Sequence, residues 1–142
     1  MRTAALALAL AACGTEPDTS GCALVPDPSG ASARAADVEP ILAASCALGG
    51  CHLHAPGAGG LVLDDGWVAA VVGVRAQESS MMLVTPGDPD DSWLVHKIYG
   101  TFCPGSCDGG VGCGAEMPFG GALSDPERAT IVAWIAAGAG GD

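Results

Sequence analysis

The sequence predicts a small, mainly α domain that is rich in loops. The chain has 142 residues, enough for one domain. Glycine and proline supply 22 and 10 of them, so much of the chain must be turn and loop. Apolar residues recur at helical spacing only in short stretches. Three Trp, two Phe and one Tyr make a small aromatic core, so we expect disulfides or a large apolar cofactor to supplement it.

Residues 1–12 have the pattern of an export signal. Arg2 supplies one positive charge, and an uncharged Ala/Leu run follows that is too short to span a bilayer. Residues 10–13 read Leu-Ala-Ala-Cys and resemble the lipobox of bacterial lipoproteins. That resemblance implies lipidation of Cys13. Gly14, the residue after it, favours anchoring of the lipoprotein in the outer membrane, facing the periplasm. An ordinary secretory signal and a buried helix are the alternatives.

Residues 13–32 are rich in Pro, Ser, Gly and Asp and show no apolar period, which is typical of a flexible tether. We expect the folded domain to occupy residues 33–142. Cys22 lies in the tether, where a lone thiol has no obvious use in an oxidising compartment, so pairing with a later cysteine is the simpler expectation. Sixteen acidic residues against five basic ones give a net charge of -11. This excludes nucleic-acid binding and favours basic protein partners.

Two helical segments are predicted in the first half of the domain. The first covers 38–47, with Asp37 placed to cap it and Pro40 tolerated in its first turn. Its apolar face carries Val38, Ile41, Leu42 and Cys46. The second covers 65–73, where the density of β-branched residues leaves a strand as the alternative.

Two more helices are predicted near the end of the chain. A short one covers 92–99, with Trp93, Leu94 and Ile98 facing inward. The last covers 123–137 and is opened by a capping box of Ser124 and Glu127 and ended by Gly138. Ile131, Trp134 and Ile135 form its core stripe. We expect the opening and closing helices of the domain to pack together.

A pair of cysteines followed by a histidine stands at the end of the first predicted helix. Four residues separate Cys46 from Cys51, and His52 follows directly. The segment resembles a c-type haem attachment site, in which both cysteines form thioethers and the histidine ligates iron. The usual spacing is two residues, but two adjacent glycines give this longer loop the freedom to bulge. A Cys46–Cys51 disulfide, or a zinc site completed by His54 or the late cysteines, is the alternative.

Met117, followed by Pro118, is the candidate for a second iron ligand. It precedes the closing helix, where His/Met cytochromes place the distal sulfur, and a thioether ligand raises the reduction potential. An ordinary loop methionine is the alternative. His96 is the rival ligand, although its apolar neighbours suggest a position on a helix surface.

Five motifs in order resemble the cytochrome c domain found in planctomycetes and myxobacteria. They are Cys46–His52, Gly60–Asp64, Pro86–Ser92, Met117-Pro118 and Trp134–Ala139. The resemblance implies a small helical domain around a covalent haem c held by Cys46, Cys51, His52 and Met117. It implies a membrane-anchored monohaem electron carrier of the cell envelope that acts between redox proteins and is not an enzyme. The alternatives are a non-redox, disulfide-braced lipoprotein with a binding or scaffold role, and an enzyme with an open iron position.

Four cysteines remain after the lipid-bearing residue and the haem pair are set aside: Cys22, Cys103, Cys107 and Cys113. An even number predicts two disulfides, for which three connectivities are possible. We expect them to brace the glycine-rich segment that precedes Met117. A second metal site or a redox-active pair is the alternative.

Overall fold

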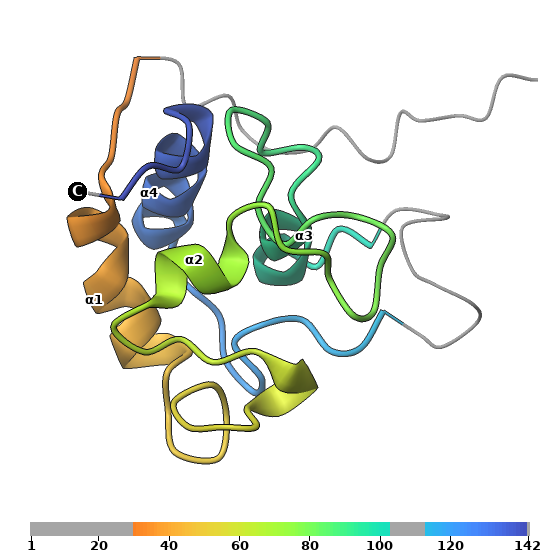
Figure 1. The fold of residues 1–142 in the computed structure, drawn as a ribbon. Coiled ribbons are helices and arrows are strands. Elements are labelled where there is room, and N and C mark those ends of the chain that lie inside the picture. The colour runs from red at the N-terminus through yellow and green to blue at the C-terminus, as the bar shows by residue number, and fades with distance from the viewer. Residues whose placement is uncertain (1–29, 103–112, 142) are drawn as a thin grey trace, which may run out of the picture.

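Short helices separated by long loops make up the computed structural model, which describes residues 30–102 and 113–141 (Figure 1). The elements are α1 (Ala35–Ser45), the 3-10 helix η2 (Ala58–Gly60), α2 (Trp67–Val71), α3 (Trp93–Tyr99) and α4 (Asp125–Ala136). The extended pairing among these residues consists of isolated bridges, such as that between Val72 and Val84. The expectation of a mainly α, loop-rich domain is therefore confirmed.

Helix α1 begins three residues earlier than predicted. Arg34 is its N-cap, and the Asp37 carboxylate accepts a hydrogen bond of 2.8 Å from the Arg34 amide. Asp37 therefore does help to cap the helix, but it does so from the third helical position and is not the N-cap itself. Pro40 lies inside the helix instead of in its first turn. A proline there removes one backbone hydrogen bond.

The capping box of α4 is confirmed. The Ser124 amide and hydroxyl both donate to a Glu127 carboxylate oxygen, at 2.8 and 2.7 Å. At the other end, the Gly138 amide donates to the carbonyl of Ile135 at 2.9 Å, and Gly138 has a φ of 104°, which glycine adopts without steric cost. The predicted start and stop of this helix are correct to within two residues.

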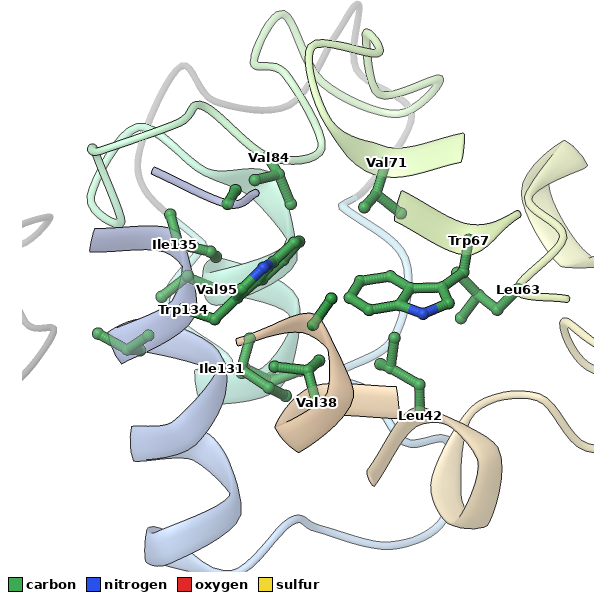
Figure 2. Close-up of a cluster of buried hydrophobic side chains, with 14 of the residues drawn as sticks. Val38, Leu42, Leu63, Trp67, Val71, Val84, Val95, Ile131, Trp134 and Ile135 are labelled. Atoms are coloured by element: carbon green, nitrogen blue, oxygen red, sulfur yellow. The ribbon is translucent and has the colours of Figure 1, made fainter. Parts of the chain in front are cut away.

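The core lies where α1, α2 and α3 meet α4 (Figures 1 and 2). The ring centroids of Trp67 and Trp134 are 4.9 Å apart, at an interplanar angle of 55°. Such tilted pairs stabilise a core beyond the apolar area they bury. Val38 and Leu42 of α1 pack in the same cluster as Ile131 of α4, which confirms that the opening and closing helices pack together.

Helix α2 is shorter than the predicted segment 65–73. Gly66 is its N-cap, and beyond its last residue the chain leaves helical geometry, so that Val72 pairs with Val84. The strand considered for this segment is thus reduced to one bridge. Burial of Trp67 and Val71 on one face fixes the helix against α4.

The turn at 86–92 docks against the end of α4. The amide of Gly87, which has a φ of 81°, donates to the carbonyl of Ile135 at 2.8 Å. The buried Ser92 hydroxyl donates to the carbonyl of Asp88 at 2.7 Å and accepts from the amide of Thr85 at 2.9 Å. These residues of the Pro86–Ser92 motif therefore stabilise the folded domain.

Several predictions fall outside the described residues. They concern the signal at 1–12, Cys13 and most of the tether with Cys22, together with Cys103 and Cys107. Among the residues that the structure does describe, no helix has both the length and the apolar character needed to cross a bilayer.

Candidate cofactor-attachment site

Helix α1 delivers Cys46 to the candidate site. Cys46 is the C-cap, and its amide and that of Ala47 both donate to the carbonyl of Leu42 at 2.8 Å, which ends the helix. The Cys46 side chain is partly buried against the hydrophobic core, whereas Cys51 is exposed. Both are free thiols, so the disulfide considered between them is not formed in this structure.

The two thiols are close enough to interact electrostatically, but they differ in burial. Burial, and after it the charge of a Cys51 thiolate, raises the pKa of the Cys46 thiol to about 11. At neutral pH the Cys46 sulfur therefore remains protonated. A partly buried thiol beside an exposed one forms a pair with two different reactivities.

The loop after Cys46 closes on itself through backbone hydrogen bonds. The amide of His52 donates to the carbonyl of Cys46 at 3.3 Å, and that of Ala58 donates to the carbonyl of Cys51 at 2.9 Å. The amide of Leu63, a core residue, donates to the carbonyl of His52 at 2.7 Å. These bonds gather Cys46, Cys51 and His52 in one loop attached to the core.

The His52 ring is oriented by a backbone carbonyl. Its Nδ1 lies 3.1 Å from the carbonyl oxygen of Leu61. Because a carbonyl oxygen only accepts, Nδ1 carries the proton and donates in this bond. The neutral ring therefore has its lone pair on Nε2. This is the arrangement by which proteins orient a metal-binding histidine and fix its tautomer.

His96 differs from His52 in both burial and hydrogen bonding. His96 is 1% exposed, so the prediction that it lies on a helix surface was wrong. Nε2 donates to the carbonyl of Asp90 at 2.8 Å, and Nδ1 accepts from the hydroxyl of Thr101 at 2.9 Å. Both ring nitrogens are occupied, so in this structure His96 joins α3 to its flanking loops and has no lone pair for a metal.

Met117 is attached to α3. Its amide donates to the carbonyl of Lys97 at 2.8 Å, and its side chain is partly buried. Nearby, Lys97 Nζ donates to the carbonyl of Cys113 at 2.9 Å. Cys113 is disulfide-bonded. The structure thus brings Cys46, Cys51 and His52 into one loop and holds Met117 on a separate segment, 113–124, that leads into α4 (Figure 1).

The residues fit a covalently attached haem by their chemistry. Two free thiols and an imidazole with a free Nε2 stand on one loop. Within 30–102 and 113–141 no group of three or more His, Cys, Asp or Glu side chains could hold a metal ion, so these residues show no zinc site of that kind. A haem iron needs only one or two ligands from the protein, because the porphyrin supplies the others.

Two contributors to the site escaped prediction from the sequence. Leu61 acts through a backbone carbonyl, which no residue type marks. Lys97 could have been singled out from the sequence because it is the only lysine in the chain. Comparison of the chain with protein family models, with curated proteins and with solved structures found no match.

Proposed function

We propose that this protein is a c-type cytochrome that carries single electrons between redox proteins of the cell envelope. Cys46 and Cys51 would attach one haem covalently, and His52 and Met117 would ligate its iron. Lipidation of Cys13 would anchor the protein in the membrane. The iron supplies the one-electron chemistry, and the protein supplies attachment, ligands and environment.

The orientation of the His52 ring carries this proposal. Its Nδ1 donates to the Leu61 carbonyl, which fixes the tautomer and leaves Nε2 as the ligating atom. His52 follows Cys51 directly, and its amide donates a hydrogen bond to the carbonyl of Cys46. A histidine held in this way beside two free thiols is the donor set that covalent haem attachment requires.

The free state of the two thiols also supports the proposal. Each thiol would add across one vinyl double bond, so that a carbon–sulfur bond forms and the thiol hydrogen passes to the other vinyl carbon. The addition needs no oxidant, and it requires thiols instead of a disulfide. Cys46 at the packed end of α1 would fix one edge of the macrocycle to the core.

The charge of the chain bears on its partners. Sixteen acidic against five basic residues favour docking to redox proteins that present basic surfaces. Such attraction accelerates encounter and weakens as salt is added. The function we propose is transfer of electrons without chemistry on a substrate.

The test is expression of the full chain in a periplasm that has cytochrome c maturation proteins. We expect a reduced pyridine haemochrome spectrum of the c type and a haem-stained band that survives denaturation. His52→Ala should reduce haem loading, whereas the matched variant His54→Ala changes an exposed ring and should not. A colourless protein whose thiols are oxidised would overturn the proposal in favour of the disulfide-braced lipoprotein.

A further inference from the structure

Lys97 is a buried cation with an unusual set of partners. The residue is 8% exposed, and its Nζ donates to the Cys113 carbonyl at 2.9 Å and pairs with Glu78 Oε2 at 3.5 Å. The ammonium also lies 5.8 Å from the ring centroid of Trp93 and 5.4 Å from that of Phe102. Burying an ammonium is costly unless such partners compensate it.

These contacts hold the segment that carries Met117 at two points. Lys97 Nζ binds the carbonyl of Cys113, and the carbonyl of Lys97 accepts from the amide of Met117 at 2.8 Å. One residue of α3 thus fixes both ends of segment 113–117. Helix α3 is itself packed on α4, so the segment is attached to the packed helices of the domain.

Gly114 shows how closely this segment approaches the Lys97–Glu78 pair. A Cβ added at Gly114 would lie 3.0 Å from Glu78 Oε2 and 3.1 Å from Lys97 Nζ. Gly114 also has a φ of 68°. The backbone of the segment therefore lies in close contact with the ion pair.

We infer that Lys97 is a positioning residue that holds Met117 where its sulfur can ligate the haem iron. This inference depends on the proposed function, in which Met117 is the distal ligand. Lys97 would not touch the iron itself. By restraining segment 113–117 it would favour the Met117-bound state over states in which an external ligand takes the same coordination position.

The test compares imidazole binding to the ferric, haem-loaded full chain and its Lys97→Met variant. This change keeps an apolar stem and removes the ammonium. Imidazole competes with Met117, so loss of one charge-assisted hydrogen bond should tighten its apparent affinity roughly tenfold. The charge-transfer absorption of thioether-bound ferric iron should weaken in parallel. Arg75→Met removes an exposed basic side chain in the same way and should change neither readout.

A second pair of variants keeps the inference testable if Lys97→Met fails to fold. Gly114→Ala presses a methyl group against the Lys97–Glu78 pair, whereas Gly73→Ala imposes similar backbone strain at a φ of 67° with open space around it. We expect tighter imidazole binding only in Gly114→Ala.

The possible outcomes separate this inference from the proposed function. A chain that never acquires haem would overturn both. A haem-loaded chain that has the Met117 signature, but whose imidazole affinity is unchanged in Lys97→Met, would overturn only the positioning role. A variant that loses thermal stability and yet keeps the imidazole affinity would assign Lys97 a structural role, and this too would overturn the inference.

Discussion

The backbone amide of Met117 donates a hydrogen bond of 2.8 Å to the carbonyl oxygen of Lys97. This bond joins the segment before α4 to the middle of α3, which is packed on α4. The position of Met117 therefore depends on tertiary packing as well as on the loop that carries it. The consequences for ligand binding can be measured.

Replacement of Met117 by leucine should open the distal iron position. Leucine preserves much of the side-chain volume and lacks the sulfur, so we expect high-spin iron, a lower reduction potential and strong binding of small ligands. Absorption spectra and potentiometric titration would show this. Met82→Leu changes a methionine elsewhere in the fold that is 39% exposed and should leave the spectrum unchanged. A low-spin Met117→Leu protein would contradict the assignment of this ligand.

Replacement of His96 by alanine should destabilise the fold without changing haem ligation. The substitution removes two hydrogen bonds. It also leaves a cavity in place of the imidazole ring, because His96 is 1% exposed. We expect a loss of about 2–4 kcal/mol in the free energy of unfolding, measured by urea denaturation. His54→Ala should stay within about 0.5 kcal/mol of wild type. Loss of the low-spin spectrum in folded His96→Ala would show instead that His96 is a ligand.

The two thiols of the haem-free protein should react at very different rates. Burial, and then Cys51, raise the pKa of Cys46 to about 11, so at pH 8 about one Cys46 in a thousand is a thiolate. We expect iodoacetamide to modify the exposed Cys51 at least tenfold faster, as read by peptide mass spectrometry. Cys51→Ser should lower the pKa of Cys46, but burial should keep it above the ordinary value of 9.0. Equal rates would contradict the burial of Cys46.

The capping box of α4 should give stability that depends on pH. Hydrogen bonds from the Ser124 hydroxyl, and then from its amide, lower the pKa of Glu127 below 4.5. Because the folded pKa lies below the unfolded one, the stabilisation is complete above the unfolded pKa and is lost as pH falls through the folded pKa. Wild type should therefore exceed Glu127→Gln in its urea midpoint at pH 7, and the difference should shrink on acidification below pH 4.5. Glu39→Gln, on the exposed side of α1, serves as the control.

The helices were predictable because their signals are local. The Ser124–Glu127 capping box and the stripe of Ile131 and Trp134 located α4 without tertiary information. The start of α1 was misplaced because Asp37 has the same preference for the N-cap as for the first turn. Only the contact with the preceding chain at Arg34 decides between the two positions.

The sequence by itself determined which residues stand together in the candidate site, since Cys46, Cys51 and His52 are close along the chain. It could not distinguish the histidines, because the lone pair left on each ring depends on its partners: the Leu61 carbonyl for His52, the Asp90 carbonyl and Thr101 hydroxyl for His96. Tertiary structure also decided the role of Lys97. No residue type marks a backbone carbonyl that will accept a hydrogen bond. Only the folded structure therefore shows that the Lys97 ammonium donates to the carbonyl of Cys113.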